Sequence, residues 1–589
     1  MIPVPLAFLW LALAPVPQAG PTFPAEVEVI TVDALVLDGH GRPVTGLTRD
    51  DFRVFEDGQP REIVSFEAYD RGGTPGGDEK EETVPPPIAT NASGTELRGR
   101  AFALLLDDLF TPPQESGAVR KGAEKFLRQS VGPGDEVTIA TTSGNAYWTA
   151  GLPEGLEDLL AVAARFKGRD AQGRYGTQEF IATPTPGVRD LVLEVKRMTE
   201  VQAYGIVKNG MGGDTKIAHE IDHIRRLRMR ITLAAVRRQL DALAGLRGRK
   251  SLILISPGFL LDDTPDIQDT AAASRRANTA VYFVNVRGLQ TDSAFSAANR
   301  VEVGPGFTHF TGEESERNLV AAGTETLADD TGGFSIRNVN DFGAATGRIA
   351  AESRAYYLLG IHPAEGKGAR DWRKLTVEVA RKGLKVRARR GYSLRDAPPP
   401  EEDAKDKDKR AAPTRKTLDP VVAGALDSAH AVSGIPLRAM VYVMEPGPRD
   451  TTRVVVAAEF DPQNLGRGGP SAKLGFSVNI THRDTGRAFE SNQRVEVRFG
   501  DGAPAGWRAI TREFMLPAGV ASARVVVHDP VSGARGAVTQ RLEVPPASAF
   551  RLSTPILTNA IDRSGKRPQA AVAVHRVFQM DGQIFCQFE

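Results

Sequence analysis

Short apolar runs alternate with amphipathic segments through the middle of this chain of 589 residues. The runs at 101–107, 137–141, 252–255 and 280–286 are almost wholly apolar, which is typical of strands buried on both faces of a parallel sheet. Between them apolar residues recur at helical spacing, as in Val119–Leu127. This alternation predicts an α/β fold in which a mostly parallel sheet has helices on both faces.

Strand patterns without helices lie on either side of this central region. Near the N-terminus, short β runs surround the hairpin signal Glu56-Asp57-Gly58 and predict a small β module. After a Pro-rich and charged stretch, short β runs recur between 439 and 527 with turn residues separating them, which predicts a β-sandwich. The expected organisation is a signal peptide at 1–19, a β module at 25–70, a linker at 71–98, an α/β domain at 99–395 with a helical insertion at about 170–230, a charged linker at 396–417, a β-sandwich at 418–545 and a β tail at 546–589.

The first residues are typical of an export signal. Leu6–Ala14 is an apolar core too short to span a bilayer, and Ala12-Leu13-Ala14 fits a cleavage site, although basic residues before the core are missing. A buried N-terminal segment is the alternative. No other apolar run is long enough to cross a membrane, so we expect an exported, periplasmic or extracellular protein.

Composition narrows the classes of partner. The formal net charge is +1, from 74 basic and 73 acidic residues, and this balance argues against a nucleic-acid partner. The single cysteine excludes an intrachain disulfide.

Several motifs together suggest a family. Ala101–Thr111 places Asp107 at the end of a buried strand, the edge at which open α/β sheets bind ligands. Gly46–Phe52 reads GLTRDDF, Ile255–Phe259 reads ISPGF and Tyr357–Gly360 reads YLLG. In these residues the chain resembles the von Willebrand factor A (VWA)-related exported proteins of acidobacteria and similar soil bacteria. The resemblance implies a Rossmann-like VWA domain, a role in extracytoplasmic protein–protein interaction or adhesion, and no enzymatic activity.

The metal-ion-dependent adhesion site of a VWA domain is incomplete in this sequence. The full site needs Asp-x-Ser-x-Ser, a loop threonine and a late aspartate, because Mg²⁺ takes oxygen ligands. Asp107 and Thr111 match, and Thr177 is a candidate for the loop threonine, but Leu109 and Pro257 stand where oxygen ligands are required. We therefore expect that the Mg²⁺ site is degenerate and that this edge of the sheet binds a partner protein without a metal. Alternatively, Asp107 and Thr111 only cap the following helix. The carboxylates that could replace some of the missing metal ligands are Asp108, Asp262 and Asp263.

A second motif has the form of a zinc-protease site. His219-Glu220-Ile221-Asp222-His223 would place two zinc ligands, His219 and His223, on one helix face with Glu220 as general base. No glutamate follows before the strand at Leu252 to serve as third ligand, and Arg226 and Arg230 share the histidine face. We therefore favour an amphipathic helix inserted in the α/β domain. A zinc metallopeptidase and a purely structural envelope protein are the two alternatives to a partner-binding protein.

Overall fold

The computed structural model describes most of the chain after residue 28. The described residues are 29–70, 88–91, 99–169, 214–244, 246, 250–259, 265–286, 324–337, 342–364, 372–393, 420–427, 431–462, 465, 471–498, 507–548, 552–562, 569, 570, 572, 574, 578 and 582–588. The expected signal peptide and charged linker lie outside these residues. None of the helices described is long and apolar enough to cross a membrane.

The chain is α/β, and its central sheet is built from the apolar runs. The six strands of this sheet are β6 (Ala101–Leu106), β7 (Glu136–Thr141), β8 (Tyr147–Gly151), β9 (Lys250–Ser256), β10 (Thr279–Asn285) and β11 (Ser335–Ile336). Their spatial order is β11-β10-β9-β6-β7-β8. All neighbouring pairs are parallel except β7 and the edge strand β8, which are antiparallel. The four strands expected from the sequence therefore form and lie side by side.

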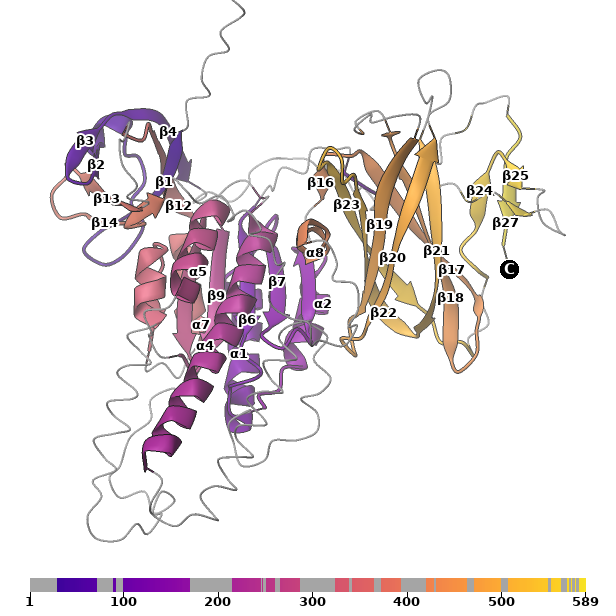
Figure 1. Ribbon diagram of the computed structural model, residues 1–589, viewed down its shortest axis with the longest axis horizontal. Coiled ribbons are helices and arrows are strands. Elements are labelled where there is room, and N and C mark those ends of the chain that lie inside the picture. Colours follow the sequence, from indigo (N-terminus) through magenta and orange to yellow (C-terminus); the bar gives the residue numbers. More distant parts are fainter. Residues whose placement is uncertain are drawn as a thin grey trace, which may run out of the picture.

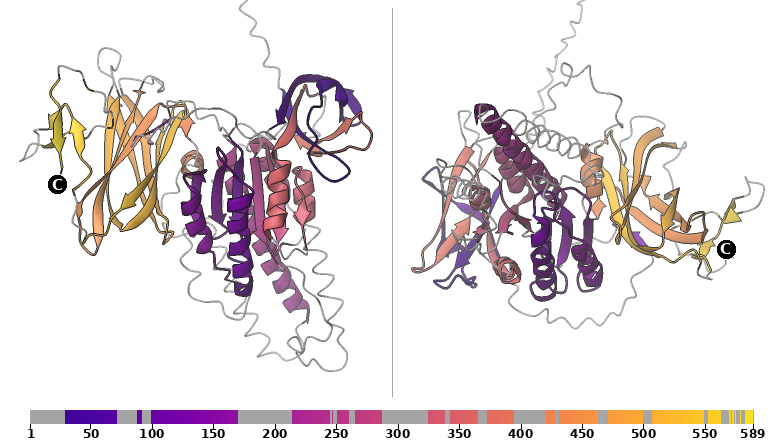
Figure 2. Two further views of the ribbon diagram at one scale, coloured as in Figure 1. Left: turned by 180° about the vertical axis from the view of Figure 1, so that it is seen from behind. Right: turned by 90° about the horizontal axis from the view of Figure 1, so that it is seen from below.

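Helices cover both faces of this sheet, as Figures 1 and 2 show. On one face lie α1 (Ser116–Gln129), α2 (Leu156–Ala164) and α7 (Phe342–Glu352), with η2 (Pro113–Glu115) before α1. On the other lie α4 (Asp214–Leu243), α5 (Pro265–Ala277) and a helical segment at 324–330. Leu104 and Leu106 pack toward the first group, whereas Ala103 and Leu105 pack toward the second. This alternation of buried side chains is what a central strand with two covered faces requires.

The small β module is larger than the sequence indicated. Its strands are β1 (Ile30–Leu37), β2 (Phe52–Glu56), β3 (Gln59–Arg61), β4 (Ile63–Asp70), β12 (Ala355–Ile361), β13 (Trp372–Val379), β14 (Lys385–Ala388) and β15 (Gly391–Ser393), with η1 (Arg49–Asp51) before β2. They form sheets ordered β14-β1-β12-β4 and β15-β13-β2-β3. Residues 355–393, which we assigned to the α/β domain, thus pair with residues 30–70. The β2–β3 hairpin forms as expected, with Asp57 and Gly58 at positive φ in a two-residue turn.

The C-terminal region forms the expected β-sandwich. One sheet is ordered β16-β23-β22-β19-β20 and the other β21-β18-β17-β5. Its elements are β5 (Ala89–Thr90), α8 (Pro420–Asp427), β16 (Val432–Ser433), β17 (Leu437–Pro446), β18 (Thr451–Phe460), β19 (Ser471–His482), β20 (Ala488–Arg498), β21 (Arg508–Pro517), β22 (Gly519–His528) and β23 (Arg535–Val544). Its core contains Phe460 and Phe476, both fully buried.

Two segments differ from the sequence interpretation of this region. Ala89–Thr90, inside the expected linker at 71–98, forms β5 and pairs with β17. The adjacent Asn91 is buried: its side-chain oxygen accepts from Leu437 N at 2.6 Å, and its amide donates to Ile435 O at 2.8 Å. In the tail, β24 (Ile556–Thr558) pairs with β27 (Phe585–Gln587), and β25 (Ile561–Asp562) pairs with β26 (Gln569–Ala570).

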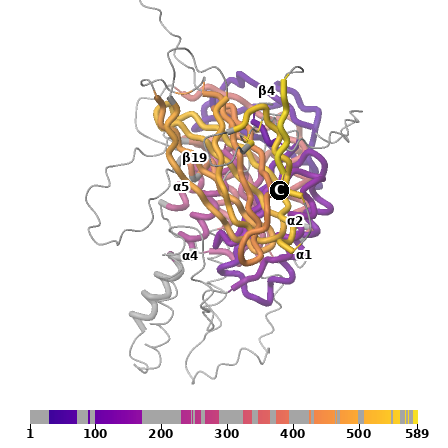
Figure 3. Tube along the Cα trace, turned by 90° about the vertical axis from the view of Figure 1, so that its right-hand side faces the viewer, coloured from indigo at the N-terminus to yellow at the C-terminus, as the bar shows by residue number. Residues whose placement is uncertain are grey.

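The sandwich packs against the central α/β layer through a buried ionic contact. Asp158 of α2 is 4 % exposed and accepts from Arg483 Nη1 at 2.8 Å and from Arg541 Nε at 2.6 Å. Burial raises the pKa of Asp158, but the two guanidinium groups outweigh it and hold the pKa below its ordinary value. Val520 of the sandwich also joins the core of the α/β layer. In Figure 3 the sandwich strands lie in front of helices α1 and α2.

Candidate partner-binding edge

The carboxylate of Asp107 lies in a closed hydrogen-bond network where β6 ends. The residue is fully buried. Ser256 Oγ, at the end of β9, donates to its Oδ2 at 2.6 Å, and Thr142 Oγ1, just after β7, donates to its Oδ1 at 2.9 Å. The backbone N–H of Phe110 donates to Oδ1 at 3.2 Å. Three neighbouring parallel strands therefore meet at this acid.

Asp108 extends the same network toward the α2 side. Its carboxylate accepts from Ser143 N at 2.9 Å and from Ser143 Oγ at 2.5 Å, and Thr142 Oγ1 lies 3.1 Å from its Oδ1. Because a hydroxyl carries one proton, the proton of Thr142 is shared between the two neighbouring carboxylates. The guanidinium of Arg169 forms an ion pair with Asp108 at 3.4 Å. The second acid is thus neutralised inside the protein.

The acids of this edge were predicted from the sequence, but most of their partners were not. Asp107 and Thr111 do lie at the predicted edge, and Asp108 joins them. Thr142, Ser143, Ser256 and Arg169 were not identified. The first three follow or end a buried strand, and this position was a signal that could have found them, because parallel strands end at one edge. Thr177, Asp262 and Asp263 lie outside the described residues.

The described residues do not fit a Mg²⁺ ion. Magnesium demands near-octahedral oxygen coordination. Leu109 is fully buried and supplies no side-chain oxygen, and proline stands at 257 in place of the late aspartate. Both oxygens of Asp107 already accept hydrogen bonds. The hydroxyl of Thr111 is buried without a hydrogen-bond partner among the described residues, so of Asp107 and Thr111 only Thr111 has a side-chain oxygen that remains available.

The histidine motif falls on α4. His219, Glu220 and His223 lie in the first half of this helix, and their side chains are outside the described residues. From Met229 onward the helix packs into the core, where Leu233 and Val236 are buried. Arg230 is exposed and pairs with Asp266 at 3.7 Å. No group of three or more metal-ligating side chains is found within the part of the chain that is described.

A cavity of about 720 Å³ opens beside this network, between the α/β layer and the sandwich. Leu106, Asp108 and Thr141 line it from the ends of β6 and β7. The segment 165–169 that follows α2 forms a second wall, and residues 485–490 at the β19–β20 turn form a third. The cavity therefore lies at the carboxyl edge of the sheet and is shared by two parts of the molecule.

Two glycines allow the walls of this cavity to approach the edge. A Cβ on Gly168 would lie 2.4 Å from the carbonyl oxygen of Thr111, so only glycine lets the segment after α2 pass there. Gly486 has φ +69°, and a Cβ on it would lie 2.2 Å from the carbonyl oxygen of Asn145. Arg165 completes the junction: its guanidinium donates to the carbonyl oxygens of Arg483 and Asn145. Burial lowers the pKa of Arg165.

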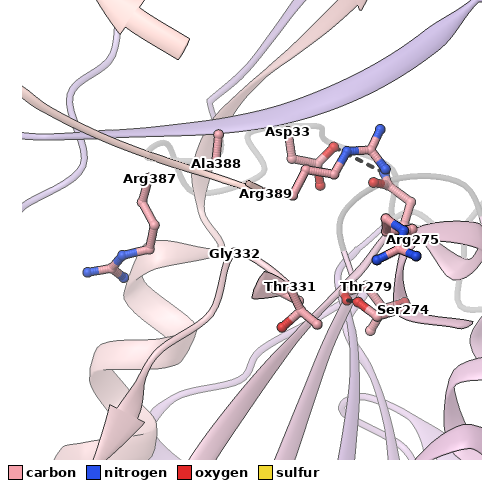
Figure 4. A pocket seen from close by; sticks show the side chains of 11 residues that line it. Asp33, Ser274, Arg275, Thr279, Thr331, Gly332, Arg387, Ala388 and Arg389 are labelled. Atoms are coloured by element: carbon pink, nitrogen blue, oxygen red, sulfur yellow. Dashed lines mark hydrogen bonds between the residues drawn. The ribbon is translucent and has the colours of Figure 1, made fainter. Parts of the chain in front are cut away.

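A second cavity, at the junction with the β module, is much smaller. Figure 4 shows Asp33 and Arg389 on one side of it and Ser274 and Thr331 on the other. The amide of Asn278 donates to Asp33 Oδ1 at 3.1 Å across the junction. The volume is about 20 Å³, room for roughly one water molecule. It is too small to hold an organic ligand.

Comparisons with known proteins leave the family open. No family model matches the chain, and no curated protein matches it. Among solved structures, a Northeast Structural Genomics Consortium target is similar over 20% of this chain and 93% of its own, with 15% identity and a TM-score of 0.15. A Bacteroides uniformis beta-glucuronidase is similar over 34% of this chain and 19% of its own, with 7% identity and a TM-score of 0.15. These scores are too low to support a shared fold.

Proposed function

We propose that this is an exported, non-enzymatic VWA-related protein that binds another protein at the carboxyl edge of its central sheet, without a resident metal. The observation that carries the proposal is the cavity of about 720 Å³ at that edge. Open α/β sheets bind their ligands outside the carboxyl ends of the strands. A cavity there, rather than at the opposite end, is what a binding function at this edge requires.

The order of the strands supports the VWA-related part of the proposal. If the strands of the central sheet are counted along the chain from β6, their spatial order is 3-2-1-4-5-6 with the third antiparallel. This is the doubly wound order, which reverses between β6 and β9, and the cavity lies beside that point, at the ends of β6 and β7. Asp107 follows β6 at that point. The helices on both faces agree with the same arrangement.

The closed network around Asp107 supports binding without a metal. Ser256 and Thr142 supply hydrogen-bond donors to its carboxylate. A buried carboxylate is stabilised by donors just as it is by a cation, so the edge keeps its shape without an ion. The hydrogen-bond network then keeps this end of the sheet rigid, and the side chains around the cavity make the contacts with a partner.

A steric block tests this proposal without changing any charge. Ala488 is exposed and lines the cavity from the sandwich side, so Ala488→Trp would place an indole ring in or across it. Ala351 on α7 is also exposed and is outside the cavity lining, so Ala351→Trp is the matched control. Immobilised wild-type and variant proteins are incubated with an extract of the producing cells, and captured proteins are quantified by mass spectrometry.

The two variants separate a binding edge from a purely structural protein. We expect Ala488→Trp to lose a specific captured protein that wild type and Ala351→Trp both retain. If all three proteins capture the same set in equal amounts, the edge is not a partner-binding site and the structural alternative is correct. Circular dichroism melting of each variant establishes that the fold is intact.

A further inference from the structure

The cavity at the sheet edge is strongly biased toward basic side chains. Arg165, Lys167, Arg169 and Arg487 line it, against the two carboxylates of Asp108 and Glu490. The lining therefore carries a formal charge of +2, whereas the whole chain carries +1. Asp108 is already held by Ser143, Thr142 and Arg169, so its charge is directed inward. Of the other charged groups in the lining, Lys167, Arg487 and Glu490 are exposed, and Arg165 is partly buried.

Two of these cations are available to a ligand. Lys167 and Arg487 are exposed, and neither has a carboxylate within ion-pair distance among the described residues. The guanidinium of Arg487 lies 4.8 Å from the centroid of the Phe489 ring. A guanidinium that stacks on an aromatic ring is held in orientation, and its N–H groups still point outward in its own plane. Such a group is suited to a carboxylate, which accepts two parallel hydrogen bonds.

The size of the cavity indicates the kind of anion. At about 30 Å³ for each water molecule of liquid, its volume corresponds to roughly twenty-four waters. One phosphate or carboxylate would leave most of this space unfilled and would reach only part of the basic lining. Successive carboxylates on an extended peptide could instead meet Lys167 on one wall and Arg487 on the other.

We propose that this cavity binds a carboxylate-rich segment of the partner protein, with Lys167 and Arg487 as its principal ion-pairing groups. The proposal rests on the proposed function, since it names the chemistry of the partner at the same edge. The α/β layer contributes Lys167 and the sandwich contributes Arg487, so recognition requires both parts of the chain. Gly486 permits the close approach of the β19–β20 turn, because a Cβ there would lie 2.2 Å from the carbonyl oxygen of Asn145.

The test measures binding of a fluorescein-labelled hexaglutamate peptide to the full chain by fluorescence anisotropy. The variant Lys167→Glu/Arg487→Glu reverses both exposed charges. The control Lys121→Glu/Lys473→Glu makes the same change in net charge at exposed positions on α1 and β19 that do not line the cavity. Inorganic phosphate is titrated separately as a small free anion, and each titration is repeated between about 0.05 M and about 0.5 M NaCl.

We expect wild type and the control to bind hexaglutamate saturably, with an affinity that falls as salt rises. The cavity variant should bind at least about tenfold more weakly, because two attractions become repulsions. Absence of saturable hexaglutamate binding, or equal binding by the cavity variant and the control, would overturn the proposal. It would also be overturned if phosphate binds in a way that depends on Lys167 and Arg487 while hexaglutamate does not, because the site would then take a small anion. If Ala488→Trp prevents capture of the partner protein but the charge reversals do not weaken hexaglutamate binding, the proposed function stands and only the acidic character of the partner segment is rejected.

Discussion

The buried acid Asp158 holds the sandwich against the α/β layer, and its removal gives the most quantitative prediction. Asp158→Asn keeps the shape of the side chain and removes its charge, which leaves Arg483 and Arg541 facing a neutral amide. Loss of one partner from a buried ion pair costs about 3–5 kcal/mol, whereas an exposed pair contributes only about 0.2–1 kcal/mol. The side chain of Asp158 is 5% exposed, but those of Arg483 and Arg541 are 22% and 54% exposed.

The partial exposure of the two arginines places the expected cost between these limits. We expect Asp158→Asn to weaken the docking of the sandwich by about 2–3 kcal/mol, which corresponds to about a 30- to 150-fold change in the docking equilibrium. Hydrogen–deuterium exchange followed by mass spectrometry measures this directly. Backbone amides of 156–164 and 482–486 should lose protection, whereas those of β9 and β10 should not.

A matched control variant and a pH series test whether the charge of Asp158 holds the sandwich in place. Glu157→Gln removes the same charge from an exposed position on the same helix and should leave exchange unchanged. Because the pKa of Asp158 is lowered on folding, its contribution is present above the ordinary value of 3.8 and is lost as the pH falls through the folded value. The difference in hydrogen exchange between wild type and Asp158→Asn should therefore disappear at acid pH. Equal exchange in Asp158→Asn and Glu157→Gln at neutral pH would refute the account of the docking contact.

Two buried side chains and the edge at Asp107 can be tested separately. Asn91→Ala should cost about 2–4 kcal/mol in urea denaturation followed by tryptophan fluorescence, because backbone groups of Leu437 and Ile435 lose buried partners; an unchanged midpoint would show that β5 does not stabilise the sandwich. Burial lowers the pKa of Lys250 to about 8 from 10.5, so the unfolding free energy should rise by about 3 kcal/mol between these pH values. Lys250→Met should remove this rise, and an identical pH dependence in the variant would contradict it. Addition of EDTA should leave the melting temperature of the full chain unchanged, whereas loss of an ion present at a hundred times its Kd would remove about 2.7 kcal/mol.

The local pattern of the sequence predicted the elements far better than their partners. The apolar runs that became β6, β7, β9 and β10 are unambiguous because both faces of each strand are buried. Residues 355–361 were assigned to the α/β domain, whereas they form β12 and pair with residues 30–34 and 63–70. Periodicity shows that a strand has a buried face and carries no information about which distant segment it pairs with.

The residues of the candidate site were likewise predictable only in part. Asp107, Asp108 and Thr111 could be predicted because they directly follow one buried strand. Ser256 and Thr142 lie at the ends of strands that were themselves predicted. A comparison of the ends of all predicted strands would therefore have identified the network. The cavity could not be predicted from the sequence, because its walls at 165–169 and 485–490 are more than three hundred residues apart in the chain. Only the docking of the sandwich, through Asp158 and Gly486, brings them together.

Site-specific photo-crosslinking shows whether a partner protein binds at the carboxyl edge of the sheet. Benzoylphenylalanine is placed at Glu490, an exposed position that lines the cavity, and separately at Lys121, an exposed position on α1 outside it. Each full-length protein is irradiated in an extract of the producing cells, and crosslinked peptides are identified by mass spectrometry. We expect a crosslinked partner at 490 but not at 121, with the attached peptide rich in aspartate and glutamate. Crosslinks of equal yield at both positions, or none at 490, would contradict a binding site at the carboxyl edge of the sheet.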